Sequence, residues 1–299
     1  MKTESVLMVL FKKLGCVRMA WSLRRLHCPV APDALVLEVG SGGNPYWRAN
    51  VLCDAYLDTS ERHFAKLISD RPTVLAFTEK LPFADDTFDF VIASHVLEHS
   101  DQPEKFLSEI QRVAKAGYIE VPDAFFERLG TYSCHRSEIT DRDGVLMIRK
   151  KRAYIQDPEI YELHGKKTGQ LLPKWMNRNP FEFHVRYYWS RVTGGIEYRI
   201  VNPDYIFDWT PEESARHQPQ LPISARFKAG CLHIFRLLLS QTSRNSKLRV
   251  QDLLRCPVCH SLKFSQSESN IQCRQCQNIF PIRERGILDF TDVMAKEQS

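Results

Sequence analysis

Short apolar runs alternate with helix-length connections over the first 123 residues. Continuous apolar runs are typical of strands that are buried on both faces, as in parallel sheets. The predicted strands are residues 35–39 (LVLEV), 50–53 (NVLC), 73–77 (TVLAF), 88–94 (FDFVIAS) and 118–121 (YIEV). Before the last of them, PEKFLSEIQRVAKAG has apolar residues at helical spacing, and Gly117 suits the end of that helix. This alternation predicts an open, mainly parallel α/β sheet.

The pattern changes after Asp123. The segment CHRSEITDRDGVLMIRKKR predicts a hairpin with its turn at Asp143-Gly144, and HVRYYWSRVTGGIEYRIVNP predicts a second with its turn at Gly194-Gly195. Residues 154–180 are polar and are interpreted as an insertion, and residues 203–222 as a loop. The later segment SARFKAGCLHIFRLLLS predicts a helix, and QTSRNSK a linker.

Residues 4–26 have the pattern of one amphipathic helix with several basic residues. Its apolar run, SVLMVLF, is seven residues long, which is too short to cross a bilayer, and no small-residue cleavage site follows it. Two interpretations stay open. The helix docks against the main domain, or it rests on a membrane surface.

Composition and charge narrow the class of protein. A hydrophobic content of 43% indicates a packed core and excludes wholesale disorder. The net charge is +5, and the excess of positive charge lies in residues 124–250, which contain 21 basic and 13 acidic residues. An anionic partner is therefore expected there. Four of the nine cysteines form two CxxC pairs and the others are scattered, which predicts reduced thiols, metal binding and an intracellular, cytoplasmic location.

The first predicted strand ends in a glycine loop, Glu38-Val-Gly-Ser-Gly-Gly-Asn-Pro. Glycines let a backbone turn sharply and approach a ligand closely, although such a loop alone is weak evidence. The second strand is followed by Asp54, an acid that is placed to receive the two hydroxyls of a ribose.

Together, EVGSGG, Asp54, LPFADDTFD and SHVLEH resemble a class I S-adenosylmethionine-dependent methyltransferase of the type 11 group, over residues 33–123. The resemblance implies a Rossmann-like, seven-stranded α/β sandwich that binds S-adenosylmethionine. The cofactor-binding residues that it implies are Glu38, Gly40, Ser41, Gly42, Asp54, Thr78, Glu79, Leu81 and Ser94.

The resemblance also suggests where catalysis would occur. His95 follows the fourth strand and would face the methyl-transfer site, as a base or a positioning group. His135 is the other catalytic candidate, and Arg136 could clamp an anionic group of the acceptor. Two departures stand out. Phe77 replaces the acid that usually contacts adenine, and Asn44-Pro45 is expected to shorten the first helix.

The second motif is Cys256-x2-Cys259 followed by Cys273-x2-Cys276. Two such hooks predict a tetrahedral four-cysteine zinc site, which leaves no open position and is therefore structural. His260 is an alternative ligand. With FPIRERGILDF behind it, the module resembles the small zinc-ribbon activator subunit of tRNA and translation-factor methyltransferases. That resemblance implies bracing of the enzyme in cis, substrate docking, or a protein partner.

The expected organisation is an N-terminal helix (1–30), a methyltransferase domain (31–215, with its cofactor half at 31–123 and a substrate side at 124–215), a helix and linker (216–250) and a zinc ribbon (251–292). The leading hypothesis is methyl transfer to a small-molecule acceptor or a lipid- or nucleotide-linked glycan, with peripheral membrane contact. RNA is the alternative acceptor, because Tyr187, Tyr188 and Trp189 would suit base stacking. A non-catalytic S-adenosylmethionine-binding module is the third hypothesis.

Overall fold

The computed structural model describes residues 1–59, 66–130, 132–154, 158–163, 171–210 and 238–292. The chain forms two compact units, each built from separate stretches of sequence. The first contains Met1–Pro29, Ala93–Pro103 and Ala116–Glu212, and the second contains Val30–Ile92, Glu104–Lys115 and Glu213–Ser299. The predicted helix at 224–240 lies almost wholly outside the described residues.

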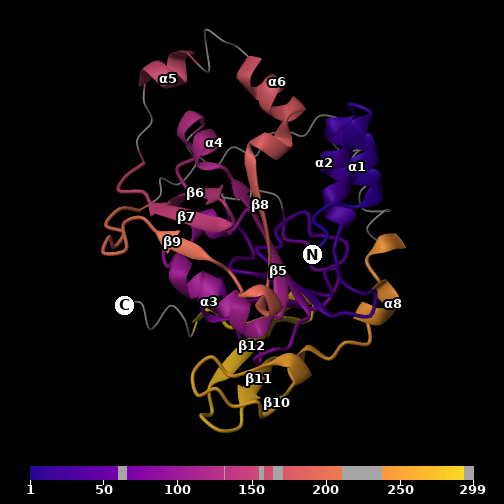
Figure 1. Ribbon diagram of the computed structural model, residues 1–299. Helices are drawn as coiled ribbons and strands as arrows, with labels where there is room; N and C mark the ends of the chain where they lie inside the picture. Colours follow the sequence, from indigo (N-terminus) through magenta and orange to yellow (C-terminus); the bar gives the residue numbers. More distant parts are fainter. Residues whose placement is uncertain (60–65, 131, 155–157, 164–170, 211–237, 293–299) are drawn as a thin grey trace. The chain divides into compact units, whose positions relative to one another are not determined.

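The second unit is organised around parallel strands β1 (Val36–Val39), β2 (Val51–Asp54) and β3 (Thr73–Leu75), which belong to the indigo-to-purple part of the ribbon in Figure 1 and carry no labels there. All residues of the three strands are buried, as continuous apolar runs require. Strand β4 (Phe90–Ser94) begins in this unit and ends in the first. The predicted strands at 35–39, 73–77 and 88–94 were one or two residues too long, and the one at 50–53 was shifted by one residue, but their order and type are confirmed.

Two expectations about helices in this unit need correction. Helix α3 (Pro103–Val113) ends four residues before Gly117, which instead lies in a strand of the first unit. A Cβ at Gly117 would lie 2.6 Å from Nε1 of Trp189, so the glycine makes room for that indole. The shortened first helix is also wrong, because the described residues 40–50 form turns and no helix.

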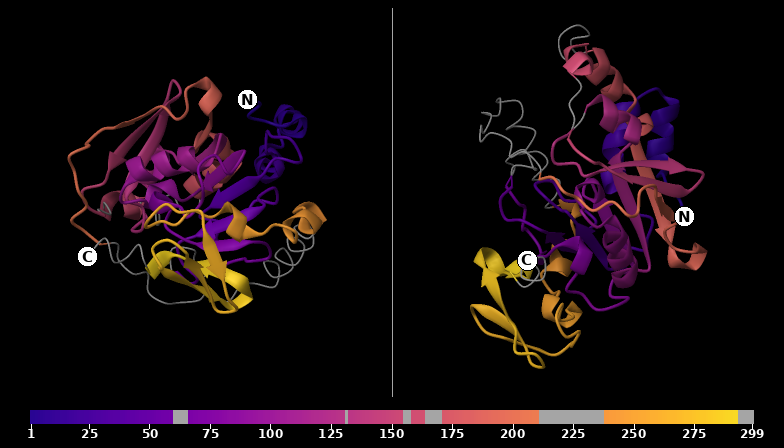
Figure 2. Two further views of the ribbon diagram at one scale, coloured as in Figure 1. Left: turned by 90° about the horizontal axis from the view of Figure 1, so that it is seen from below. Right: turned by 90° about the vertical axis from the view of Figure 1, so that its left-hand side faces the viewer.

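The C-terminal residues of the second unit extend its sheet. Strands β10 (Phe264–Gln266), β11 (Asn270–Cys273) and β12 (Ile279–Arg283) are antiparallel and are drawn in yellow tones in Figure 2. Strand β13 (Ile287–Asp289) follows them and pairs in parallel with β3. The remaining short helices of this unit are η3 (Thr78–Lys80), α8 (Thr242–Asn245), η8 (Val250–Leu253) and η9 (Glu284–Gly286).

The expected linker QTSRNSK is partly helical and contributes to the core of this unit. Asn245, in α8, is buried, and its Oδ1 accepts a hydrogen bond from Nδ2 of Asn50 at 2.8 Å. Asn50 Oδ1 accepts in turn from the backbone N–H of Val36 at 3.0 Å. Polar side chains from two distant segments thus fix the start of β1.

The described strands of the first unit belong to two sheets. Strand β5 (Ala116–Pro122) pairs antiparallel with β8 (His184–Ser190) over seven residue pairs. Strands β6 (Ser137–Arg142) and β7 (Val145–Lys150) form the predicted hairpin, with positive φ at Asp143 and Gly144. The second predicted hairpin is wrong, because β9 (Tyr198–Ile200) pairs in parallel with β7 rather than with β8.

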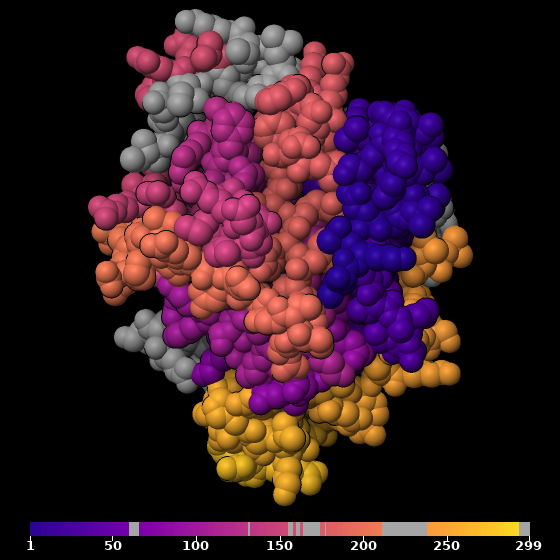
Figure 3. Space-filling model, in the orientation of Figure 1, coloured from indigo at the N-terminus to yellow at the C-terminus, as the bar shows by residue number. Residues whose placement is uncertain are grey.

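The N-terminal segment is two helices rather than one. Helix α1 (Val6–Lys13) is separated from α2 (Val17–Leu23) by Gly15, whose φ of 72° reverses the chain. The two helices lie side by side at the surface (Figure 3, indigo), and α2 continues into η1 (Arg24–Leu26). Among the residues that the structure describes, no helix is both long and apolar enough to cross a membrane.

The other helices of the first unit are short. They are η4 (Leu97–His99), α4 (Ala124–Leu129), α5 (Pro158–Glu162), α6 (Leu171–Arg178), η6 (Pro180–Glu182) and η7 (Arg191–Thr193). The stretch interpreted as an insertion, residues 154–180, therefore contains α5 and α6 in its described part.

Candidate cofactor site and metal centre

The glycine loop after β1 folds back onto the end of β2. Gly40 and Gly42 have φ angles of 63° and 56°, in the left-handed region that favours glycine. The backbone N–H of Ser41 donates to the carbonyl of Cys53 at 3.1 Å, and that of Gly42 donates to Oδ2 of Asp54 at 2.8 Å. The loop and the acid after the second strand, which the sequence joined only by a motif, are therefore in direct contact.

Both acids of this site are buried and are held by backbone donors. Oε2 of Glu38 accepts from the N–H of Tyr46 at 2.7 Å, and Oδ1 of Asp54 accepts from the N–H of Tyr56 at 3.1 Å. Both carboxylates are therefore anchored by backbone groups of the segments that follow β1 and β2.

Ser41 gives an independent indication of a ligand. Its side chain is buried, and within the described residues its Oγ has no hydrogen-bond partner. Buried hydroxyls normally have one, and a bound ligand is one of the ordinary ways to supply it. The donors and acceptors of this loop, with the two acids, fit the methionine and ribose parts of S-adenosylmethionine.

The segment expected along the adenine is fixed from behind. The N–H of Leu81 donates to Oε2 of Glu109 at 2.7 Å, and Arg112 pairs with the same carboxylate. Thr78 is buried at the start of η3, and Glu79 follows it. Sequence reasoning missed this support, because Glu109 and Arg112 lie about thirty residues after Leu81 and no local motif links them to it.

An aromatic pair also lies in this segment, where the expected acid is absent. The ring of Phe77 meets that of Tyr56 edge to face, with 5.7 Å between centroids. Tyr56 lies two residues after Asp54 and is 45% exposed. The position of Tyr56, so soon after Asp54, was the feature of the sequence that could have predicted an aromatic side chain beside this acid.

In the first unit, the end of β4 leads into a network of buried charges. Ser94 donates from Oγ to Oε1 of Glu120 at 3.1 Å. Glu120 is fully buried and receives two bonds from Arg24, Nε to Oε2 at 2.7 Å and Nη2 to Oε1 at 3.0 Å. Burial would raise the pKa of Glu120, but His95 and Arg24 outweigh it and hold the pKa well below its usual range.

His95 is held between two carboxylates. Its Nδ1 lies 3.4 Å from Oε1 of Glu98, and its Nε2 lies 3.4 Å from Oε1 of Glu120. Burial would lower the pKa of His95, but the two carboxylates outweigh it and raise the pKa to about 9. At neutral pH this side chain is therefore an imidazolium, which can donate hydrogen bonds or attract an anionic group but is poorly suited to accept a proton.

His135 and Arg136 are both engaged by neighbours. His135 is buried, and its Nδ1 lies 2.6 Å from Oε2 of Glu127. Arg136 pairs through Nε with Asp101 at 2.7 Å and donates from Nη1 to the carbonyl of Trp209 at 2.7 Å. These contacts give Arg136 a structural role in the first unit, whereas the expected anion clamp has no support from this geometry.

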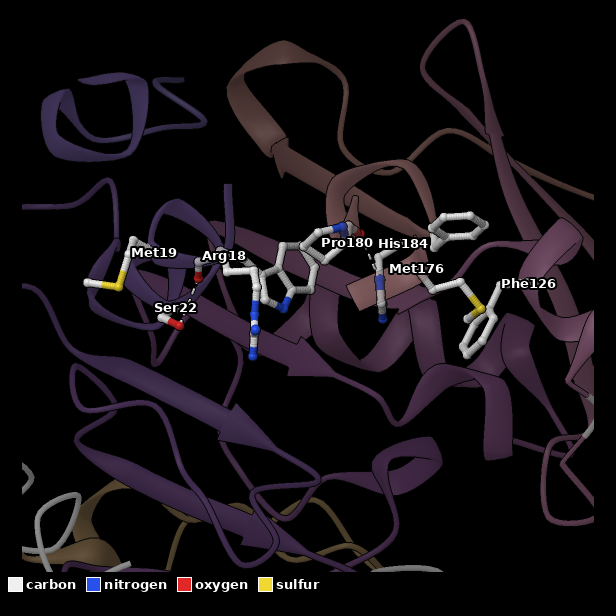
Figure 4. Close-up of a pocket in the computed structure, with 9 residues that line it drawn as sticks. Arg18, Met19, Ser22, Phe126, Met176, Pro180 and His184 are labelled. Carbon is white, nitrogen blue, oxygen red and sulfur yellow. Dashed lines mark hydrogen bonds between the residues drawn. The ribbon is translucent and has the colours of Figure 1, made fainter. Parts of the chain in front are cut away.

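A pocket of about 520 Å³ lies in the first unit (Figure 4). Its walls are mostly apolar and aromatic, with one arginine and one histidine. They comprise Arg18, Met19, Trp21, Ser22, Phe126, Met176, Pro180, Phe183 and His184. The ring of His184 meets that of His95 edge to face at 5.3 Å. The pocket thus adjoins one of the catalytic candidates, and sequence reasoning did not predict it because its walls come from three segments that are far apart in the sequence.

The four predicted metal-binding cysteines converge in the second unit. The Sγ atoms of Cys256 and Cys276 are 3.6 Å apart and those of Cys259 and Cys273 are 3.5 Å apart, and all four lie within 4.8 Å of one another. Tetrahedral Zn–S bonds of about 2.3 Å require S–S separations of about 3.8 Å. His260 is exposed and is not part of this cluster.

Each cysteine hook has the same local structure. The residue after the second cysteine, His260 or Gln277, has a left-handed φ (61° and 64°). Its N–H donates to the carbonyl of the first cysteine, at 2.9 Å in one hook and 3.0 Å in the other. The backbone therefore presents both thiols of a hook to one point, as a structural zinc site requires.

Comparison with known proteins concerns the site at the glycine loop and Asp54. Residues 37–119 match the family model described as "Methyltransferase domain". This segment contains the glycine loop, Asp54 and β4. The expected fold class, a Rossmann-like α/β methyltransferase fold with a small C-terminal cysteine module, is confirmed.

Two curated relatives are similar over part of the chain. The ubiquinone/menaquinone biosynthesis C-methyltransferase UbiE of Cronobacter sakazakii is 34% identical over 128 residues, 41% of this chain and 49% of the relative. An uncharacterized protein of Methanocaldococcus jannaschii is 38% identical over 58 residues, 19% of this chain and 28% of the relative. The chain therefore spans half or less of each of these relatives.

Solved structures are similar at low identity. A possible histamine N-methyltransferase from Thermotoga maritima is 18% identical, covers 38% of this chain and 57% of its own, and has a TM-score of 0.28. A Haloferax volcanii complex between the Trm112 methyltransferase activator and a methyltransferase is 14% identical, covers 63% and 96%, and has a TM-score of 0.36.

Proposed function

We propose that the protein transfers a methyl group from S-adenosylmethionine to a small-molecule or lipid-linked acceptor, which includes a lipid- or nucleotide-linked glycan. One observation carries the methyltransferase proposal. The N–H of Gly42 in the glycine loop donates to Asp54 at the end of β2, and Glu38 lies in the neighbouring strand β1. All three residues lie in the segment that matches the methyltransferase domain. When bound, the cofactor supplies an electrophilic methyl on its sulfonium, and positioning of the acceptor does much of the remaining work.

The residues of the loop have separate tasks in this proposal. The loop amides and Glu38 hold the methionine end, and Asp54 accepts from the ribose hydroxyls. Tyr56 and Phe77 flank the adenine. His95, as an imidazolium beside the pocket of Figure 4, attracts and orients a polar or anionic group of the acceptor.

Isothermal titration with S-adenosylmethionine tests the cofactor site. Asp54→Ala removes charge-assisted hydrogen bonds worth about 2–3 kcal/mol, so affinity should fall about 30- to 100-fold. Asp58→Ala, an exposed acid four residues later, is the matched control and should bind like the wild type. Equal binding by Asp54→Ala and wild type would contradict the proposal.

The acceptor class is supported by the pocket and by the N-terminal helices. Trp21, Phe126 and Phe183 give the pocket aromatic walls, and such walls suit a sugar ring or an apolar group. Helix α2 lines it. Val6 of α1 and Leu14, directly after α1, are exposed near basic residues, which suits contact with a lipid surface. Tyr187 and Trp189, which would have stacked on RNA bases, are buried between other side chains.

A methyl-transfer assay separates the acceptor classes. Tritium from labelled S-adenosylmethionine should appear in the small-molecule or lipid extract of cells, and Phe183→Ala should reduce that incorporation. Label in RNA, together with salt-sensitive retention of RNA by the purified protein, would favour the RNA alternative. Cofactor binding without transfer to either fraction would favour the non-catalytic module.

For the cysteine module we propose a structural zinc ion and bracing of the enzyme in cis. Support comes from contacts inside the second unit. The N–H of Phe290 donates to the carbonyl of Leu75 at 2.9 Å, extending the β13–β3 pairing, and the N–H of Arg255 donates to the carbonyl of Pro82 at 3.0 Å. Ile287 is buried in one cluster with Leu67 and Leu75. The module therefore completes the sheet edge next to β3.

Loss of the ion should weaken this edge. Cys273→Ser removes one thiolate, and because metal binding and folding are linked, the melting temperature and the bound zinc should both fall. Cys16→Ser, an exposed cysteine at the other end of the chain, should change neither. Unchanged melting of Cys273→Ser, with loss of a captured protein partner, would favour the docking role instead.

A further inference from the structure

The first unit contains a second group of side chains that are typical metal ligands. His99 ends η4, and Cys134 and His135 precede β6. One ligand atom from each of the three lies within 4.8 Å of the others. The two imidazole rings are 4.8 Å apart at 83°, so they converge edge to face rather than stack.

Backbone contacts fix these residues beside one another. The N–H of Arg136 donates to the carbonyl of Glu98 at 2.7 Å, which ties the segment that contains Cys134 and His135 to η4. The N–H of His135 donates to the carbonyl of Tyr132 at 3.2 Å. The arrangement is therefore set by the chain and does not depend on long, flexible side chains.

A carboxylate orients one of the two imidazoles. Nδ1 of His135 lies 2.6 Å from Oε2 of Glu127, so Nδ1 is the nitrogen that donates and Nε2 carries the lone pair. Glu127 is itself buried and paired with Lys151. Metal-binding histidines almost always donate their second nitrogen to such a carboxylate, which fixes the tautomer and the ring. His135 is thus already supported in the manner of a metal ligand.

We propose that His99, Cys134 and His135 bind one zinc ion in the first unit, separate from the ion of the four cysteines. Imidazole nitrogens and thiolates are the ligands that zinc prefers in proteins, and three protein ligands leave the fourth tetrahedral position open. The four-cysteine cluster leaves no such open position, because four thiolates complete the tetrahedron. The new site has the composition of a zinc centre that holds a water molecule or a substrate atom.

Zinc content of the full-length protein tests the proposal. After gel filtration and dialysis against a weak chelator, wild type should hold about two zinc ions per chain. Cys134→Ser and His99→Asn should each hold about one, and Cys16→Ser should hold about two. A wild type with one zinc, unchanged content in Cys134→Ser, or copper in place of the second zinc would overturn the proposal.

X-ray absorption at the zinc edge of wild type gives a test that does not depend on whether the variants fold. A four-cysteine site alone gives sulfur scatterers at about 2.3 Å. The second site adds nitrogen scatterers at about 2.0 Å to the spectrum of wild type. A spectrum with sulfur alone overturns the proposal. Neither measurement depends on cofactor binding, so this proposal can fail independently of the methyltransferase proposal.

Discussion

Buried carboxylates are held in opposite ways in the two units of this protein. At the ends of β1 and β2, Glu38 and Asp54 accept hydrogen bonds from backbone N–H groups of the glycine loop and of Tyr46 and Tyr56. In the first unit, Glu120 and Glu127 are paired with the side chains of Arg24, His135 and Lys151. The first pair belongs to a loop that can take a ligand, and the second belongs to a packed core.

The difference indicates what each acid contributes. A backbone N–H neutralises little of the carboxylate charge, so a ligand with hydroxyl or ammonium donors still gains from binding there. A carboxylate that is already paired with a guanidinium has little left to offer a ligand, but its removal leaves a buried charge unpaired. We therefore expect substitutions in the two groups to separate affinity from stability.

The largest expected effect is on the Arg24–Glu120 pair. Arg24→Met leaves the fully buried Glu120 without its bidentate partner, which should lower the free energy of unfolding by about 3–5 kcal/mol. Urea unfolding measures the loss. Arg128→Met is the control, because its pair with Glu138 is exposed and such pairs contribute at most about 1 kcal/mol. Equal, small losses in both variants would refute the structural role of the buried pair.

Glu38→Gln tests the acids at the ends of β1 and β2, where affinity rather than stability is expected to change. The amide oxygen of glutamine can still accept from Tyr46, so the free energy of unfolding should change by about 1 kcal/mol or less. Loss of the charge should weaken S-adenosylmethionine binding about 10- to 100-fold, as read by titration calorimetry.

Glu120→Gln provides the crossed control for this measurement. It should destabilise the fold while the folded protein keeps its affinity for the cofactor. If Glu38→Gln lost stability and Glu120→Gln lost affinity, the division between ligand-binding and structural acids would be wrong.

Local patterns in the sequence predicted much of this structure. The continuous apolar runs gave β1 to β4, Asp143-Gly144 gave the first hairpin, and the two CxxC hooks gave the cysteine cluster. Each of these features depends on residues that are close in sequence. The glycine loop and Asp54 were also found, because a motif in a known order fixes which strand ends meet.

Non-local pairing accounts for most of what the sequence did not predict. Nothing in residues 184–203 indicates that β8 pairs with β5 and β9 with β7, because alternating strands read alike whichever partner they take. The pairing of β13 with β3 joins residues more than two hundred positions apart. Arg24 is one of several basic residues in the N-terminal segment, and nothing near it in sequence indicates that Glu120, 96 positions later, is its partner.

The smallest expected effect is on the pH dependence of stability through His95. The groups that face it include the carboxylates of Glu98 and Glu120 and the rings of His184 and His99, and Arg24 lies beyond Glu120. The carboxylates raise the pKa of His95 to about 9, above the ordinary value of about 6.5. Its contribution is therefore complete below about pH 6.5 and is lost as the pH rises through about 9.

Melting temperatures of wild type and His95→Asn, measured from pH 6 to 10, check this expectation. Asparagine tolerates the left-handed φ of 57° at this position, so the variant changes the charge with little backbone strain. The difference between the two proteins should be largest near pH 6 and should disappear near pH 10. His260→Asn is the matched control, since His260 has a φ of 61° and is exposed, and it should follow the wild-type curve. A constant difference across the range would show that His95 contributes by packing and not by its charge between the two carboxylates.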